Sequence, residues 1–258
     1  MEKAKKIEEK FLKSLEEWYK NYLLIHARSS SKIAPIHKCI SEILKEELGD
    51  NFEIRSMGIG NNKEYNLEGK YYSKSLDITI LKDGKPISAL AVKFVTSNYK
   101  QNSNNYFENM LGETANVKRN DLLYGQILIL REQMPYFSTD KKQFTNIEII
   151  NETNLKKYFK LWMDNAENLY HKPDIMFIWF VKTGDEDRIF EARKNKEKIN
   201  KKEFNKKICE LVELEFVNID ELKGNFSEEM RNFLKKHSNF TFFIESFVNL
   251  TKGKTYWK

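Results

Sequence analysis

An aspartate and a lysine in a predicted β-hairpin are the residues of this sequence best suited to catalysis. The segment SLDITILKDGKPISALAVKF spans residues 75–94, with Asp77 at the start of one strand and Lys93 toward the end of the next. Cross-strand neighbours on one face of a hairpin stand about 5 Å apart. An aspartate fixed on a strand can hold a divalent cation, and a nearby lysine can orient or help deprotonate a water molecule. The pair therefore predicts a metal-assisted hydrolytic site.

The geometry of the turn decides whether these two side chains share a face. A strict two-residue turn would pair Asp77 with Leu90 and put Lys93 on the opposite face. A three-residue loop beginning at Asp83 would pair Asp77 with Ala91 instead and leave the lysine on the same face. The predicted chemistry therefore requires the longer loop or a β-bulge.

The hairpin and the residues after it resemble the PD-(D/E)XK nuclease superfamily, and within it a group of type II restriction endonucleases. The resemblance lies in GKYYSKSLDITI (69–80) and ALAVKFVTSNYKQNSNNYFENMLGETANV (89–117), which cover about 50 contiguous residues. Asp77 and Lys93 match the first acid and the lysine of the D…(D/E)XK motif. The resemblance implies a Mg²⁺-dependent endonuclease that hydrolyses double-stranded DNA to 5′-phosphate and 3′-hydroxyl ends. It also implies a restriction-endonuclease-like α/β fold, with a mixed central sheet flanked by helices.

One motif position departs from this pattern, because Ala91 stands where the family has Asp or Glu and cannot bind a metal. Three interpretations follow. The acid comes from another element, the residue has been changed to abolish cleavage, or the protein is a naturally inactive relative. We favour the first, because related enzymes place the second acid on the helix after the lysine strand.

Two glutamates on the predicted helix 105–118 are candidates for that second acid. Glu108 lies 15 residues after Lys93, a separation similar to that in the related enzymes, and Glu113 is the alternative. At about 100° per residue the two point about 140° apart, so only one can face the metal. The expected site has Asp77, Glu108 and the carbonyl of Val92 holding Mg²⁺, with Lys93 acting on the water.

A polar segment joins the catalytic strand to this helix. Asn and Gln side chains can bond adenine bidentately in the major groove, and Lys can contact phosphate. We expect DNA contacts from this segment, with an ordinary polar loop and an Asn helix cap as the alternative. The candidates are Asn98, Tyr99, Lys100, Gln101, Asn102, Asn104 and Asn105.

Hydrophobic spacing predicts the elements that position these residues. We expect helices over 1–28, 34–48, 105–118, 154–171, 197–209 and 220–236, and strands over 51–60, 76–81, 87–95, 124–131, 174–182 and 212–217. Gly49 is a plausible C-cap and the serines at 29–31 break the first helix. Strands separated by helices predict a mixed sheet covered on both faces. The single domain, 1–258, would comprise an N-terminal helical part (1–50), a catalytic core (51–182) and a C-terminal helical part (183–258).

Composition narrows the remaining possibilities. With 10 Gly and 4 Pro in 258 residues, linkers and disorder are not expected. The net charge of +6 permits a polyanion partner without indicating one. Cys39 and Cys209 lack the spacing of a zinc site, and the four histidines are scattered. The sequence has neither a Walker motif for a nucleotide cofactor nor an apolar run for a membrane span. A cytoplasmic location is the default expectation.

The sequence thus predicts a site-specific endonuclease that acts as a homodimer, because a two-fold nuclease can cut both strands of a palindromic site. Two alternatives stay open. A DNA-binding relative without catalysis would bind DNA in EDTA and cut under no metal. A structure-specific nuclease would cut branched DNA better than linear duplex.

Overall fold

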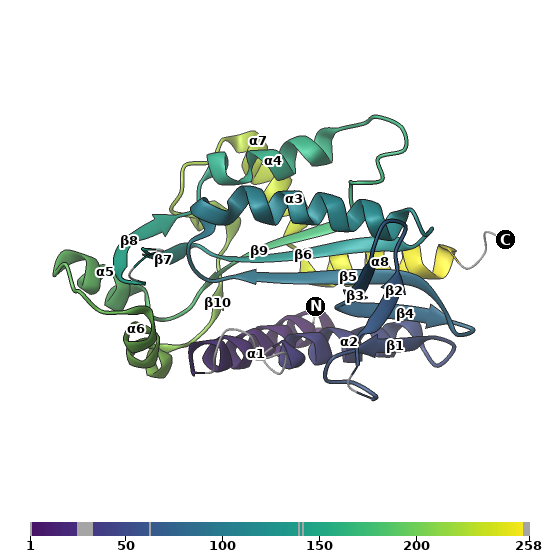
Figure 1. The fold of residues 1–258 in the computed structure, drawn as a ribbon, viewed down its shortest axis with the longest axis horizontal. Helices are drawn as coiled ribbons and strands as arrows, with labels where there is room; N and C mark the ends of the chain where they lie inside the picture. Colours follow the sequence, from purple (N-terminus) through teal and green to yellow (C-terminus); the bar gives the residue numbers. More distant parts are fainter. Residues whose placement is uncertain (1, 25–32, 62, 139, 141, 255–258) are drawn as a thin grey trace.

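The computed structural model describes residues 2–24, 33–61, 63–138, 140 and 142–254. Within these residues a curled, mixed central sheet has the strand order β1-β4-β5-β6-β9-β10 (Figure 1). Strands β5, β6 and β9 run parallel, and the outer strands pair antiparallel. The bounds are β1 (Glu53–Ser56), β4 (Ile78–Lys82), β5 (Lys85–Val95), β6 (Leu123–Arg131), β9 (Ile175–Lys182) and β10 (Glu215–Phe216). The predicted mixed α/β architecture is confirmed at this level.

The central strands are covered on both faces. All of β6 is buried, as is β9 except for its two end residues. A strand enclosed on both faces has a continuous apolar run rather than an alternating one. This is the pattern of LYGQILILR in β6 and IMFIWFVK in β9, both of which the sequence predicts as strands.

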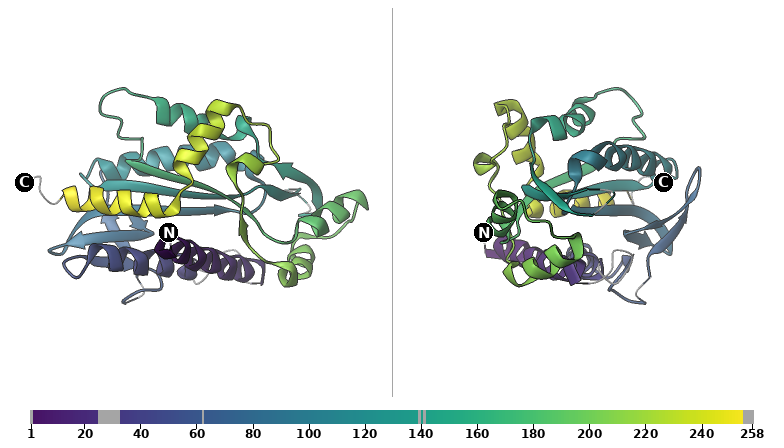
Figure 2. Two further views of the ribbon diagram at one scale, coloured as in Figure 1. Left: turned by 180° about the vertical axis from the view of Figure 1, so that it is seen from behind. Right: turned by 60° about the vertical axis from the view of Figure 1, so that its left-hand side comes forward.

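Helices form a layer on each face of the sheet, and Figure 2 shows both layers from two further directions. One core cluster joins α1 (Glu2–Leu24), α2 (Ala34–Leu48) and α8 (Phe240–Lys254) to the sheet. The other joins α3 (Tyr99–Lys118), α4 (Glu152–Met163) and α7 (Glu228–His237). The predicted helix over 34–48 is confirmed, and so is the described part of the helix predicted over 1–28, whose residues 25–28 lie outside the described residues. Gly49 ends α2 with φ 85°, and its N–H donates to the Lys45 carbonyl at 3.0 Å. The predicted serine break at 29–31 lies outside the described residues.

Several elements differ from the expectation. The helix expected over 154–171 ends at Met163, and that expected over 220–236 begins at Glu228, after Ser227 has capped it through its hydroxyl. The sequence reasoning missed two hairpins, β2 (Tyr65–Glu68) with β3 (Ser73–Leu76) and β7 (Gln133–Phe137) with β8 (Phe144–Ile149), as well as α5 (Glu186–Lys194) and α8. The basic helix is the shorter α6 (Lys201–Ile208), and 3₁₀ turns span 209–211 and 219–221.

A buried ion pair ties the C-terminal end of β6 to the start of α5. Arg131 and Asp185 are fully buried and their side chains meet at 2.5 Å. The Arg131 guanidinium also donates to the Tyr19 hydroxyl on α1, and Thr183 donates to the Asp185 carboxylate at 2.6 Å. The carboxylate thus holds the arginine's charge where water cannot reach it.

No helix in the described part of the chain has both the length and the apolar character required to cross a membrane.

Candidate active site

The β4–β5 hairpin contains the bulge that the predicted chemistry requires. Its turn is a two-residue one at Asp83 and Gly84, whose positive φ angles of 52° and 73° suit a type I′ turn. The register then shifts between Ile80 and Leu81, so that Ile78 pairs with Leu90. Continuing that register by one residue brings Asp77 opposite Ala91. The bulge therefore corrects the register that the tight turn alone would have set, and the prediction of a bulge or longer loop is confirmed.

Asp77 occupies the bend where β3 passes into β4, and its side chain is about one-third exposed. The Val92 N–H donates to its carboxylate at 2.8 Å. In a β-strand the N–H and C=O of one residue point toward the same neighbouring strand. The Val92 carbonyl consequently points to the side on which Asp77 lies.

The Asp77 carboxylate and Lys93 open into one pocket of about 560 Å³. Ala91 and Lys93 point to the same face of β5, since their side chains are two residues apart. The lysine is exposed, and its Nζ lies 5.0 Å from the centre of the Tyr106 ring on α3. The structure thus brings together the two residues that the motif predicts to act together.

Glu113 of α3 is the second carboxylate of this pocket. The Tyr124 hydroxyl of β6 donates to it at 2.6 Å, and Lys74 of β3 pairs with it at 3.0 Å. Burial, reinforced by the neighbouring Glu113 charge, raises the pKa of Tyr124 well above its ordinary value, so the phenol remains a donor. Glu113 is therefore held in place by two donors from two different strands.

Lys74 pairs with Glu113 and interacts electrostatically with Asp77. Burial of its ammonium lowers the Lys74 pKa, but the charge of Glu113 and a smaller contribution from Asp77 outweigh it, and the pKa is raised overall. Burial, together with the Asp77 charge, also raises the pKa of Glu64, which lies just before β2. The pocket therefore holds two carboxylates, Asp77 and Glu113, together with the ammonium groups of Lys74 and Lys93.

Glu108 is not brought into the pocket. Its side chain is exposed, and its charge acts on Lys157 of α4, on the other flank of α3. Helical geometry required that only one of Glu108 and Glu113 could face Asp77, and the structure selects Glu113. The reason is that Tyr106 and Met110, seven and three residues earlier, pack toward the sheet on the same flank of α3 as Glu113.

Gln126 is a pocket residue that the sequence reasoning missed. It lies on β6 directly beside Ala91 in the parallel register and is 7% exposed. Its amide oxygen is a hard ligand of the kind that Mg²⁺ and Ca²⁺ accept. The signal was available, since Gln126 is the one strongly polar side chain between Leu123 and Leu130 in an apolar strand.

His37 lies behind Asp77 and was also missed. The α2 histidine is 1% exposed, and its Nε2 is 4.0 Å from the Asp77 Oδ2. Burial lowers the His37 pKa and Asp77 only partly offsets this, so the ring is neutral at pH 7. A neutral ring against the carboxylate leaves the charge of Asp77 directed to the pocket.

The predicted DNA-binding segment has a different structure from the expected loop. Helix α3 begins at Tyr99 rather than near residue 105. Tyr99 is fully buried and its hydroxyl lies beside that of Tyr158, so it has no surface for a DNA contact. The Asn98 side chain bonds both backbone groups of Phe137, at 2.7 and 3.0 Å, and thereby holds the loop to β7. These two residues are structural.

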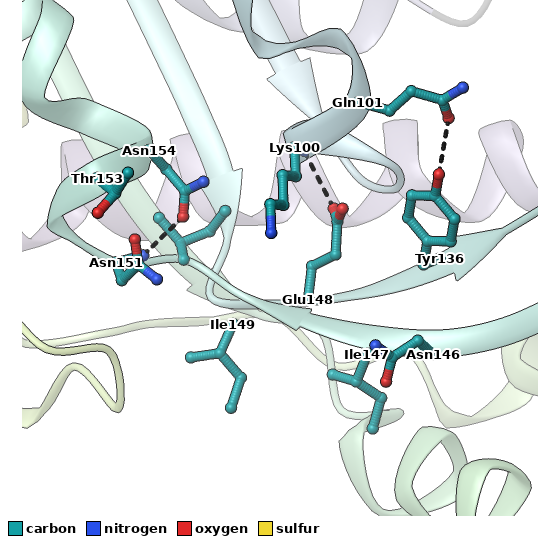
Figure 3. Close-up of a pocket in the computed structure, with 11 residues that line it drawn as sticks. Lys100, Gln101, Tyr136, Asn146, Ile147, Glu148, Ile149, Asn151, Thr153 and Asn154 are labelled. Carbon is teal, nitrogen blue, oxygen red and sulfur yellow. Dashed lines mark hydrogen bonds between the residues drawn. The ribbon is translucent and has the colours of Figure 1, made fainter.

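The other members of the segment lie at the surface. Lys100 and Gln101 line a cavity of about 700 Å³ against β7, β8 and the start of α4 (Figure 3). There the Gln101 amide accepts from the Tyr136 hydroxyl at 3.2 Å, and Glu148 accepts from the Lys100 N–H at 3.3 Å. The remaining members are the half-buried Asn102, which donates to the Asn98 carbonyl, the exposed Asn104, which accepts from Lys157, and the exposed Asn105.

The oxygen donors of the pocket suit a hard divalent cation. Asp77, Glu113 and Gln126 come from three different elements, and the Val92 carbonyl lies on the side of β5 that Asp77 occupies. Among the described residues no cluster of three His, Cys, Asp or Glu side chains could hold a metal ion. A bound Mg²⁺ would therefore take its remaining ligands from water and substrate, as this ion commonly does.

Comparison with known protein families, with curated proteins and with solved structures finds no match to this chain.

Proposed function

We propose that this protein is a Mg²⁺-dependent endonuclease of double-stranded DNA, with a restriction-endonuclease-like fold and a homodimeric active form. The observation that carries the proposal is the meeting of Asp77, Glu113 and Lys93 in one pocket. The β4–β5 bulge supports it as well, because without the register shift Asp77 would have lain opposite Leu90.

Each side chain of the pocket has a role in the proposal. Asp77, Glu113, the amide of Gln126 and the carbonyl of Val92 would hold the Mg²⁺. When bound, the ion would lower the pKa of its water and stabilise negative charge on the phosphate. Lys93 orients the attacking water, whose proton passes to solvent. The water oxygen bonds to phosphorus, the bond from phosphorus to the 3′ oxygen breaks, and that oxygen leaves with a proton from solvent.

The positioning contacts explain how the site keeps its shape. The Val92 N–H holds one oxygen of Asp77 while neutral His37 covers the carboxylate from behind. Tyr124 fixes Glu113. The pocket is thus assembled before substrate binds, which limits the reorganisation needed during reaction.

A DNA-binding protein without catalysis is the second candidate. The observation that favours it is Ala91, which is 8% exposed and lies in the pocket where the motif acid would stand. The ion pair of Lys74 with Glu113 would, in this case, permanently replace the metal. Sequence-specific binding in EDTA together with no cleavage under Mg²⁺ or Mn²⁺ would support this candidate.

The experiment that separates the candidates is incubation of plasmid DNA with the purified chain and Mg²⁺. We expect discrete fragments from the unmodified chain, none in EDTA, and none from Lys93→Ala. Lys156→Ala is the matched control, because this exposed lysine lies on α4 outside the pocket, and it should cut normally. Equal cleavage by Lys93→Ala and the unmodified chain would exclude the proposed site.

A further inference from the structure

Two adjacent tyrosines at the tip of the β2–β3 hairpin are exposed to solvent. Tyr71 is 69% exposed and Tyr72 49% exposed, values unusual for large aromatic side chains. Within the described residues the Tyr71 ring has neither a ring contact nor a cation above it. Figure 1 shows the hairpin in front of β5, with its tip reaching the level of α3, and the right view of Figure 2 shows it standing out from the body.

The tip is held rigidly despite this exposure. Asn116 of α3 is fully buried, and its side-chain oxygen accepts from the N–H groups of Tyr71, at 2.8 Å, and Tyr72, at 3.3 Å. Its amide nitrogen donates to the Tyr72 carbonyl at 2.9 Å, and its backbone carbonyl accepts from the Lys70 N–H at 3.3 Å. One asparagine side chain thus fixes the backbone of both tyrosines.

Gly69 allows the Asn116 side chain to approach the turn closely, because it has no Cβ atom. A Cβ atom at Gly69 would lie 2.2 Å from the Asn116 amide nitrogen and 2.5 Å from the Tyr72 carbonyl oxygen. The stem of the hairpin is anchored too, since Leu67 and Leu76 are buried against Val117 and Tyr124. An exposed tip that is fixed at both stem and apex is a pre-organised surface, which binds without a further cost of ordering.

The tip adjoins the catalytic pocket. Tyr72 lines the pocket together with Lys74 and Asp77, while Tyr71 lies outside it, next in the chain. Lys70 is exposed on the same turn. A polymer whose backbone enters the pocket along the Tyr72 wall would therefore meet the neighbouring Tyr71 ring.

We propose that this hairpin tip is a DNA-contacting wedge, in which the Tyr71 ring stacks on a base beside the scissile phosphate while Tyr72 forms a wall of the catalytic pocket. The inference rests on the proposed nuclease function. An aromatic ring inserted from a groove partly unstacks a base step and gains stacking with the exposed base. A rigid tip is well suited to this. The stacking energy then offsets the cost of unstacking, and none of it is lost to ordering the loop.

The test compares variants of the tip for duplex binding without cleavage. A fluorescently labelled plasmid fragment that the unmodified chain cuts is titrated in Ca²⁺, followed by gel shift. If the chain cuts nothing, a labelled random-sequence duplex is used instead. We expect Tyr71→Ala to bind at least about five-fold more weakly, the lower end of base–aromatic stacking. Tyr71→Phe keeps the ring and should bind like the unmodified chain. Phe242→Ala removes a ring that is 57% exposed on α8, and should also bind normally.

A second readout reports on the base itself. Once sequencing of fragment ends has located the cut, 2-aminopurine is placed at the positions flanking it. Its fluorescence should rise when the unmodified chain or Tyr71→Phe binds and should stay low with Tyr71→Ala, because an unstacked 2-aminopurine is brighter. Asn116→Ala, which releases the tip, should reduce both binding and the fluorescence change.

The outcomes separate this inference from the proposed function. Binding by Tyr71→Ala within two-fold of the unmodified chain overturns the wedge and leaves the nuclease intact. Equal weakening in Tyr71→Phe also overturns it, because a hydroxyl contact would then be responsible. A changed oligomeric state in Tyr71→Ala with unchanged DNA affinity would make the tip a subunit contact. If the unmodified chain binds no duplex, both proposals fail.

Discussion

The identity of the second acid can be tested by replacing two glutamates of the same helix. Glu113→Gln removes the charge that faces Asp77, yet keeps an oxygen that can accept from Tyr124, which now donates at 2.6 Å. Glu108→Gln makes the same chemical change on the exposed flank of α3. Because both positions lie in one helix, the pair controls for general effects of the substitution.

The expected magnitudes follow from the contacts. Glu113 pairs with Lys74 at 3.0 Å, with side chains 22% and 36% exposed, so losing the pair should lower the free energy of unfolding by only about 1 kcal/mol. A domain is stable by about 5–15 kcal/mol, so the variant should remain folded. A metal-held carboxylate contributes several kcal/mol to the transition state, and about 3 kcal/mol corresponds to a rate loss of about 100-fold.

Single-turnover cleavage of plasmid DNA with excess protein and Mg²⁺ measures this loss directly. Glu113→Gln should cut at least about 100-fold more slowly while binding DNA normally in Ca²⁺. Glu108→Gln should cut at the rate of the unmodified chain. Loss of cleavage in Glu108→Gln with normal cleavage in Glu113→Gln would refute the assignment and restore Glu108, which the spacing from Lys93 favoured.

Three further predictions follow from other parts of the structure. Ala91→Glu adds a carboxylate beside Gln126, so the Mg²⁺ concentration for half-maximal cleavage should fall at least about ten-fold; an unchanged metal dependence would contradict the geometry of the pocket. Burial lowers the pKa of His237 from 6.5 to about 4, so the folded chain resists its protonation. Stability should therefore be full above pH 6.5 and fall by about 3 kcal/mol as the pH drops toward 4, and urea unfolding of His237→Phe should lack that part of the loss. Asp185→Asn leaves the Arg131 charge buried without its partner and should lower the free energy of unfolding by about 3–5 kcal/mol. Asp121→Asn, at an exposed pair, should leave the free energy of unfolding unchanged. Equal effects of the two substitutions would count against the argument.

Local patterns in the sequence predicted the frame of the site. The apolar runs of β6 and β9 and the turn at Asp83 and Gly84 have local signals, and the structure has these elements where expected. The requirement that Asp77 and Lys93 share a face predicted either a longer loop or a bulge, and the structure has the bulge with a two-residue turn. The need for Asp77 and Lys93 to share a face thus constrained the β4–β5 register more tightly than the turn residues did.

The rest depended on which surfaces pack together, which a single sequence does not specify. Helical spacing showed that Glu108 and Glu113 diverge, but only the packing of α3 on the sheet selects Glu113. Gln126 lies 35 residues after Ala91 in the chain, and the sheet register brings it to the pocket. His37 lies 54 residues before Ala91, and the packing of α2 brings it beside Asp77. The start of α3 was misplaced because Asn98 takes a left-handed conformation, with φ 52°, and its polar neighbours concealed the buried Tyr99.

Sequencing the ends of the fragments that the purified chain produces from phage DNA in Mg²⁺ tests the central claim most directly. The account predicts that every end carries a 5′-phosphate within one shared sequence, that EDTA prevents all fragmentation, and that Lys93→Ala yields no ends. Intact DNA with every divalent ion tried, or identical fragments from Lys93→Ala, would contradict it.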